Sequence, residues 1–266
     1  MVELHTPFIP PYFHLWHLPV VFLAGLIGEG YGTIIGSGSI LIQFALASLG
    51  MPIASVIATD LAGCMGATAS IIVASTSPAQ IRDKRKPLLL LAVPFFFGGI
   101  AGTIFLIYVP TAILKYILIV GLPLLLWRTF VEKRITHKKM EDLHIPSRQY
   151  PVIFLVLAAL GLYNNVSGIG SGTFLRLAFV GLLRVRVTDS ISIGNIITLP
   201  AYIFSLVLTA KAGLIAWPYC LILWFGTFIG GRYAITFARK VPNRYMRGLL
   251  VIVAMLYLVW LLISIL

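Results

Sequence analysis

The sequence predicts an all-α integral membrane protein made of two inverted repeats, each with a broken, re-entrant helical hairpin and three transmembrane helices. Three observations lead to this fold class. Of the 266 residues, 59% are hydrophobic and only 11% are charged, which is the composition of a polytopic membrane protein rather than of a soluble domain. A glycine and serine motif occurs twice, each time inside a long apolar segment. Most Lys and Arg residues gather in short loops, as they do on the cytoplasmic side of membrane proteins.

The repeated motif reads IGSGS at residues 35–39 and IGSGT at residues 169–173. Each copy interrupts a segment that is otherwise apolar enough to cross a membrane. A helix broken at membrane depth leaves backbone amides and carbonyls without partners, and hydrocarbon supplies none. Two such breaks at matching places in the two halves of a chain indicate the binding site of a transporter.

The first repeat is expected to cover residues 1–131. After an aromatic segment suited to the headgroup level, residues 18–50 are expected to form the first hairpin, broken at residues 30–32. Each arm of about 12 to 14 residues would be roughly 20 Å long, too short for a hydrocarbon layer of about 30 Å. The hairpin is therefore expected to enter the membrane and return.

Three membrane spans complete the first repeat, at about residues 54–77, 88–108 and 111–130. The first of them follows Pro52 and contains small residues that allow close helix packing. Residues 82–86 have the sequence RDKRK. This first dense positive cluster predicts a cytoplasmic loop.

Residues 132–149 form the longest polar stretch, and we expect them to be a basic, cytoplasmic linker between the repeats. The second repeat, residues 150–266, is expected to begin with a hairpin at 151–183 that breaks at residues 164–168. Its three spans are expected at about residues 188–210, 218–237 and 246–265.

Matching positions in the two halves indicate an internal duplication. Asp60 falls opposite Asn195, and the glycine pair at residues 98–99 falls opposite the pair at 230–231. An odd number of crossings in each repeat makes the two halves inverted relative to one another. The hairpins would then enter from opposite faces and meet near the midplane.

The positions of the basic loops decide between this topology and the alternative of eight simple transmembrane helices. Eight crossings would place the basic loops at residues 184–186 and 239–247 outside, against the positive-inside rule. If the hairpins return, both loops are cytoplasmic and only Lys211 is left outside. We therefore expect a multi-pass protein of the cytoplasmic (inner) cell membrane, with its N-terminus outside and no cleaved signal peptide.

The break of each hairpin is a candidate anion site. The second arm begins with a helix N-terminus, where the first N–H groups have no intrahelical partner and carry partial positive charge. Two such ends facing each other could hold a small oxyanion, with glycine allowing close approach and hydroxyls adding donors. The alternative is that these residues only permit tight helix packing. The candidate residues of the two motifs are Gly36, Ser37, Gly38, Ser39, Gly170, Ser171, Gly172 and Thr173.

Three ionisable side chains lie at membrane depth, where a buried charge is costly and usually functional. Arg176 lies one turn into the second arm of the second hairpin and could either bind a sulfonate or carboxylate or pair with Asp60. Asp60 and Glu29 are candidates for a counter-ion or a proton carrier, although Glu29 could simply be solvated at the hairpin tip. Asn195 is a candidate either for the ligand or for an interhelical hydrogen bond.

No metal or cofactor site is expected. Cys64 and Cys220 lie in separate apolar runs and are expected to be small buried hydrophobic residues. His5, His14 and His17 lack the fourth ligand that a zinc site needs. The net charge of +12 is explained by the cytoplasmic loops, so nucleic acid is not an expected partner.

Taken together, these motifs resemble the sulfite exporter TauE/SafE family, also called the toluenesulfonate uptake permease family. The resemblance covers nearly the whole chain in matching order. This chain departs from the family pattern at Gln43, Asp60 and Arg176, all around the proposed site. The matching stretches are residues 35–38, 40–41, 49–52 and 58–59 in the first half, and 168–174, 212–213, 217, 230–231 and 239–242 in the second.

The resemblance implies a carrier of organosulfur compounds and related anions such as sulfite, sulfoacetate and other sulfonates. We therefore expect a secondary transporter and not an enzyme, which binds a small sulfur-containing anion between its hairpins and passes it across the bilayer by alternating access. Proton coupling through Asp60 or Glu29 is a further hypothesis. Two alternatives stay open: a channel for an anion or small solute, and, less favoured, an intramembrane phosphatase acting on a polyprenyl pyrophosphate. The sequence leaves the oligomeric state open.

Overall fold

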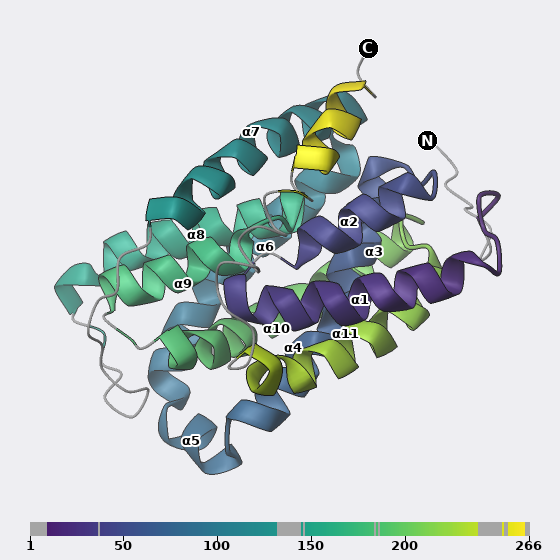
Figure 1. The fold of residues 1–266 in the computed structure, drawn as a ribbon. Coiled ribbons are helices and arrows are strands. Elements are labelled where there is room, and N and C mark those ends of the chain that lie inside the picture. The colour runs from purple at the N-terminus through teal and green to yellow at the C-terminus, as the bar shows by residue number, and fades with distance from the viewer. Residues whose placement is uncertain are drawn as a thin grey trace.

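The computed structural model describes residues 10–36, 38–131, 145, 147–183, 185, 187–238, 252 and 255–263. Within these residues the chain is helical and contains no β-strand (Figure 1). The helices are α1 (His17–Ile35), α2 (Ser39–Ser48), α3 (Ile53–Gly63), α4 (Met65–Ser75), α5 (Pro78–Asp83), α6 (Arg85–Tyr108), α7 (Thr111–Val131), the 3-10 helix η2 (Ser147–Gln149), α8 (Tyr150–Ser167), α9 (Ser171–Leu182), α10 (Val187–Lys211) and α11 (Trp217–Ala238).

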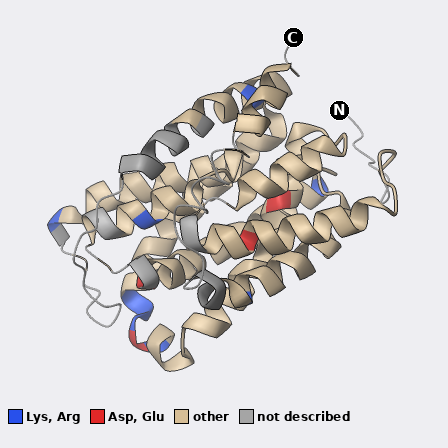
Figure 2. Ribbon diagram, in the orientation of Figure 1, with Lys and Arg blue, Asp and Glu red and all other residues tan. Residues whose placement is uncertain are grey.

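The expected fold class, an all-α membrane protein, is confirmed. In the part of the chain that the structure describes, four helices are long and apolar enough to cross a membrane: Ile53–Ser75, Arg85–Tyr108, Tyr150–Ser167 and Asp189–Lys211. Large apolar side chains are exposed on the outer faces of these helices, among them Phe97 and Val207. Such faces suit contact with lipid. Charged residues instead gather at and beside α5 (Figure 2).

The first long apolar segment folds back on itself. α1 and α2 pack against each other, and a Cβ added to Gly38 at the start of α2 would lie 2.4 Å from the carbonyl oxygen of Gly28 in α1. Further along α2, Ile42 also contacts Gly28. The segment is therefore a hairpin, and it does not continue as one straight crossing.

The second long apolar segment returns in the same way. α8 and α9 pack against each other, and the rings of Tyr163 in α8 and Phe174 in α9 lie 5.7 Å apart across the turn. These two residues are almost equally far from the break at residues 168–170. The chain reverses there.

The expected position of the first break, residues 30–32, was wrong, and the second, expected at residues 164–168, falls only at the end of that range. α1 continues through residues 30–32 and ends at Gly36, whose φ of 88° is left-handed. α8 continues through Asn164 and ends at Gly168, with φ 69°, and Gly170 follows with φ 70°. A left-handed residue ends a helix and favours glycine, whereas a glycine or asparagine inside a helix only weakens it.

Both first arms are longer than the expected 12 to 14 residues. The first arms have 19 and 18 residues and the second arms 10 and 12. At 1.5 Å per residue the first arms are about 27 to 29 Å long, close to the thickness of the hydrocarbon layer. A long arm reaches each break, and a short arm returns from it.

Each hairpin packs mainly on a helix from the other half of the chain. α1 lies along α11, and α6 lies along α8 (Figure 1). A Cβ added to Gly98 in α6 would lie 1.9 Å from the carbonyl oxygen of Ala158, and one added to Gly230 in α11 would lie 2.4 Å from that of Leu26. Glycine lets the paired helices approach backbone to backbone, as in other membrane helix pairs.

Successive contacts fix the directions of the helices. In four pairs the contact positions increase together in both helices, so these helices are parallel: α1 with α11, α6 with α8, α4 with α11, and α6 with α10. α4 and α10 run in opposite directions. Ser75 at the end of α4 bonds to Ser192 near the start of α10, while Ala62, just before α4, belongs to the same hydrophobic cluster as Ala210 near the end of α10. It follows that α1 and α8 run in opposite directions. The division into inverted repeats within a bilayer stays a prediction.

Some expected elements cannot be compared with the structure. Most of the expected linker at residues 132–149 and much of the last expected span at 246–265 lie outside the described residues. The basic loops at residues 184–186 and 239–247 fall there almost entirely. The other helices have bounds close to those expected from the sequence.

Candidate functional site

The two hairpins meet at their breaks. The backbone N–H of Thr173, in the first turn of α9, donates to the carbonyl oxygen of Gly36, which ends α1, over 3.1 Å. A Cβ added to Gly36 would lie 2.4 Å from the nitrogen of Thr173, so the approach requires glycine. Ser39, at the start of α2, likewise lies beside Gly168, which ends α8. Each second arm therefore begins next to the end of the other hairpin's first arm.

This junction differs from the expected pair of facing helix N-termini. The N-terminus of α9 faces the C-terminal end of α1, so the positive end of one helix dipole lies against the negative end of another. The amide of Thr173 bonds to Gly36 and is not available to an anion. The junction is therefore held together partly by groups that the sequence assigned to a ligand.

A cavity of about 100 Å³ lies beside the junction. Both hairpins line it, and so do α4 and α10. Glu29, Thr33 and Ser39 come from the first hairpin, and Ser171 and Arg176 come from the second. The cavity thus collects polar groups from segments that are far apart in the sequence.

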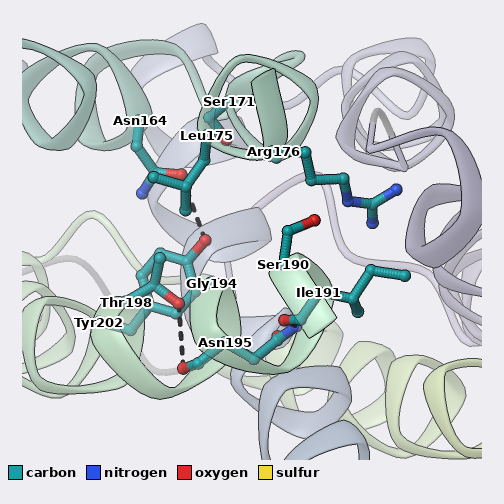
Figure 3. Close-up of a pocket in the computed structure, with 11 residues that line it drawn as sticks. Asn164, Ser171, Leu175, Arg176, Ser190, Ile191, Gly194, Asn195, Thr198 and Tyr202 are labelled. Carbon is teal, nitrogen blue, oxygen red and sulfur yellow. Dashed lines mark hydrogen bonds between the residues drawn. The ribbon is translucent and has the colours of Figure 1, made fainter. Parts of the chain in front are cut away.

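A second cavity of about 80 Å³ adjoins the first between α9 and α10 (Figure 3). The two share Ser171, Arg176 and Asn195 in their walls. Tyr202 also lines both cavities, and its hydroxyl donates to the side-chain oxygen of Asn164, in the wall of the second cavity, over 3.2 Å. Together the cavities extend from α1 to α10.

Arg176 joins the second hairpin to the end of the first. Its Nη2 donates to the carbonyl oxygen of Thr33 over 2.6 Å and lies 3.4 Å from that of Gly32. These carbonyls belong to the last turn of α1, where a cation interacts favourably with the helix dipole. The same side chain lines both cavities. Asp60 bonds to Gln43 and Cys64, and a pair between Arg176 and Asp60 stays a prediction.

The thiol of Cys64 lies between two carboxylates. Its sulfur is 3.2 Å from Oε1 of Glu29 and 3.2 Å from Oδ1 of Asp60. Glu29 and Cys64 line the first cavity, whereas Asp60 is fully buried behind them. In Figure 2 the two acidic segments on α1 and α3 lie within the helical body. The three residues form a polar cluster that reaches from the cavity into the protein.

The amide of Gln43 ties this cluster to the second hairpin. Its Nε2 donates to Oδ2 of Asp60 over 2.8 Å and to the carbonyl oxygen of Ser167, in the last turn of α8, over 2.7 Å. Gln43 itself is fully buried. The end of α8 is thus connected to the carboxylate of Asp60 by one side chain.

The hydroxyl of Thr33 is buried without a partner among the residues that the structure describes. Thr33 is 3% exposed, its Oγ1 forms no hydrogen bond within the described part of the chain, and the residue lines the first cavity. A buried hydroxyl without a partner costs about 1 to 3 kcal/mol. The cavity therefore contains a polar group suited to bond with a solute.

The structure brings most of the predicted site residues together. Gly170 and Thr173 shape the junction without lining either cavity, Asp60 lies behind Cys64, and Ser37 lies outside the described residues. Asn195 lines both cavities while donating back to the carbonyl oxygen of Ile191. A ligand role for any of these residues stays a prediction. The predicted residues that line the first cavity are Gly36, Gly38, Ser39, Ser171, Gly172, Arg176, Asn195 and Glu29.

Sequence reasoning missed Cys64, Thr33 and Tyr202. Cys64 is buried, as expected, but it contacts two carboxylates and is more than a small hydrophobic residue. Its spacing of four residues from Asp60 places both side chains on one helix face, and this signal could have found it. Nothing in the sequence marks Thr33 or Tyr202.

Comparison with known proteins gives one consistent result. The model of the sulfite exporter TauE/SafE family matches residues 20–261. A Sinorhizobium protein named "Probable membrane transporter protein ORF9" is 26% identical over 246 residues, which cover 91% of this chain and 90% of that protein. A Haemophilus influenzae protein named "Probable membrane transporter protein" is 22% identical over 240 residues, which cover 89% and 91%. No solved structure matches the chain at a significant level. The chain therefore belongs to the sulfite exporter TauE/SafE family and is a multi-pass membrane transporter.

Proposed function

We propose that the chain is a secondary transporter of small organosulfur anions, such as sulfite, sulfoacetate or other sulfonates, and that the anion is held between the two hairpins. The observation that carries this proposal is the junction of both breaks beside one cavity with Arg176 in its wall. The description of the family as sulfite exporters supports a sulfur oxyanion as the class of substrate.

The cavity offers donors that suit a small oxyanion. A guanidinium binds a sulfonate through charge-assisted hydrogen bonds. Ser171 and Gly172 lie in the first turn of α9, where backbone N–H groups favour negative charge. The hydroxyl of Thr33 would gain the partner that it lacks. A volume of about 100 Å³ has room for a solute of several non-hydrogen atoms, since one water needs only about 10 to 15 Å³ on such a measure.

Alternating access would follow from opening the junction on one side at a time. The Thr173 to Gly36 bond and the contact of Arg176 with Thr33 hold the hairpins together in this state. Opposite directions of α1 and α8 support inverted repeats, which allow one half to move against the other around a fixed site. We place the protein in the cytoplasmic membrane, with its N-terminus outside and residues 132–149 in the cytoplasm.

Uptake by proteoliposomes tests this proposal. The purified full chain is reconstituted, and entry of ³⁵S-labelled sulfite, sulfoacetate and isethionate is measured over a range of concentrations. A carrier gives saturable entry that is accelerated by the same unlabelled anion inside the vesicle. Empty liposomes and the Gly36→Ala variant, which disrupts the junction, serve as controls.

Two other outcomes would contradict the proposal. Flux that rises linearly with concentration and shows no acceleration from the far side would indicate a channel. No entry of any sulfur anion, with entry of formate or phosphate instead, would show that the substrate class is wrong.

A further inference from the structure

The charges in and behind the wall of the first cavity do not balance. The described residues that line the first cavity include one cation, Arg176, and one carboxylate, Glu29, and Asp60 lies directly behind. Taken as ionised, the three groups carry a formal charge of one negative unit. A bound monovalent anion would raise it to two. Such an uncompensated charge is costly in a buried site within a membrane.

The contacts of Cys64 also indicate a place for an added proton. One thiol hydrogen cannot donate to both Glu29 and Asp60 at once, although the sulfur lies 3.2 Å from each carboxylate. The second contact becomes a hydrogen bond when one carboxyl group carries a proton and donates it to the sulfur. Both hydrogens of the Gln43 amide are already used, on Asp60 and on Ser167. The cluster therefore has a vacant place for one proton.

Thr33 provides an independent indication that a solute occupies the cavity. Its buried hydroxyl has no hydrogen-bond partner among the described residues, and Thr33 lines the same cavity as Glu29. A ligand beside Thr33 would thus also lie in the space bounded by the carboxylate cluster. The charge of the bound anion would then act on the carboxylates of Glu29 and Asp60.

We propose that the transported anion binds together with one proton, which the Glu29, Cys64 and Asp60 cluster holds while the anion is bound. This inference rests on the proposed function and names its coupling ion. The proton enters from the water on the side to which the cavity opens, bonds to a carboxylate oxygen, and leaves with the anion on the other side. Glu29 is the acceptor in contact with the cavity, Asp60 is the buried one, and Cys64 positions the two. The other titratable or charged groups facing the cluster are Arg176 from α9, Tyr202 from α10 and Tyr257.

Calorimetry of the full chain in detergent tests the proton directly. Isethionate is the probe because its sulfonate stays ionised throughout the neutral range. Its binding is measured at pH 7.5 in triethanolamine, imidazole and Tris, which are cationic buffers with different ionisation enthalpies. The dependence of the binding enthalpy on buffer gives the number of protons taken up, and we expect about one per anion, with affinity falling up to about tenfold per pH unit as the pH rises.

Matched variants show where the proton resides. Glu29→Gln and Asp60→Asn each make one carboxyl permanently neutral, and we expect proton uptake to fall and the pH dependence of affinity to flatten. Asp83→Asn removes an exposed acid on α5 and should leave one proton taken up per anion. Binding of isethionate by Glu29→Gln and Asp60→Asn, measured in the same titrations, separates loss of the proton from general damage to the fold.

The outcomes separate this inference from the proposed function. Binding of isethionate with no proton uptake overturns the inference and leaves the anion site intact. Tight binding of taurine without proton uptake, with isethionate failing to bind, also overturns it, because the ligand's own ammonium would then supply the positive charge. If no sulfur anion binds at all, the proposed function fails and the inference fails with it.

Discussion

The guanidinium of Arg176 donates a 2.6 Å hydrogen bond to the carbonyl oxygen of Thr33, in the last turn of α1. This bond crosses from one hairpin to the other at the wall of the cavity that both hairpins line. A residue in this position both stabilises a helix end and presents a cation to the solute. Stability and binding should therefore be affected together when it is changed.

Arg176→Ala is expected to lower the stability of the ligand-free protein by about 1.5 to 3 kcal/mol, the range for a hydrogen bond to a charged group, and to abolish sulfonate binding. Arg176→Lys keeps the charge but loses the planar fork, so it should recover part of the stability and little of the binding. Thermal unfolding with and without isethionate measures both effects. Arg232→Ala, which removes an exposed arginine on α11, is the control. Unchanged binding in Arg176→Ala would remove this residue from the site.

Gly36→Ala tests the junction of the two breaks. Its Cβ would lie 2.4 Å from the nitrogen of Thr173, at a φ of 88°. Gly50 has nearly the same φ, 84°, with nothing within 4 Å of an added Cβ, so Gly50→Ala isolates the cost of the backbone conformation. We expect about 1 to 2 kcal/mol for Gly50→Ala and clearly more for Gly36→Ala, by thermal unfolding. Equal losses would mean that the breaks do not touch.

Gly98→Ala and Gly230→Ala test the two helix pairs that relate the halves of the chain. Each added Cβ would clash with a carbonyl oxygen of the partner helix, at 1.9 Å for Gly98 and 2.4 Å for Gly230. Both variants should be destabilised by about 2 kcal/mol or more, because overpacking costs at least 1 to 3 kcal/mol. Gly30→Ala, whose nearest contact is a comfortable 3.9 Å, should be neutral or stabilising. Tolerance of either large clash would contradict the close packing of that pair.

Membrane topology can be tested by labelling single cysteines in intact cells. Asp83→Cys, in the basic segment at α5, should react only from the cytoplasmic side, since positive loops face the cytoplasm. Lys211→Cys, at the end of α10, should react only from outside. The native residues Cys64 and Cys220 are buried, so the unmodified protein gives the background. Labelling of both positions from one side would contradict the proposed topology.

The fold class could be predicted from the sequence because hydropathy and composition depend on whether lipid or water surrounds the chain, and not on how its helices pack. The first break could not be placed correctly, because the glycines at residues 30–32 resemble helix breakers until packing is known, and the second was correct only at Gly168. What ends each first arm is the left-handed backbone of Gly36 and Gly168, and the sequence offers several glycines that could adopt it. Local pattern therefore located the hairpins but not their turning points.

The candidate site, too, could be predicted from the sequence only in part. Glu29, Asp60 and Arg176 stand out in the sequence because charge is rare at membrane depth. The contact of Cys64 with two carboxylates and the unpartnered hydroxyl of Thr33 depend on helices from both halves. The head-to-tail meeting of α1 and α9 also depends on tertiary packing. Such relationships carry no signal in a single sequence.

The most direct test of the shared anion cavity is thermal stabilisation of the detergent-purified chain by sulfite, sulfoacetate and isethionate, compared with Thr33→Val and Thr209→Val. Thr33→Val replaces an unpartnered hydroxyl with a methyl group of similar size, so the ligand-free protein should be as stable as the parent or more stable. Thr209→Val changes a buried threonine that bonds only to its own helix backbone, outside the cavities.

A ligand at a hundred times its dissociation constant adds about 2.7 kcal/mol of stability. We expect one sulfur anion to give this gain in the parent and in Thr209→Val, and a clearly smaller gain in Thr33→Val. An equal gain in all three proteins would place the anion elsewhere and contradict the central claim.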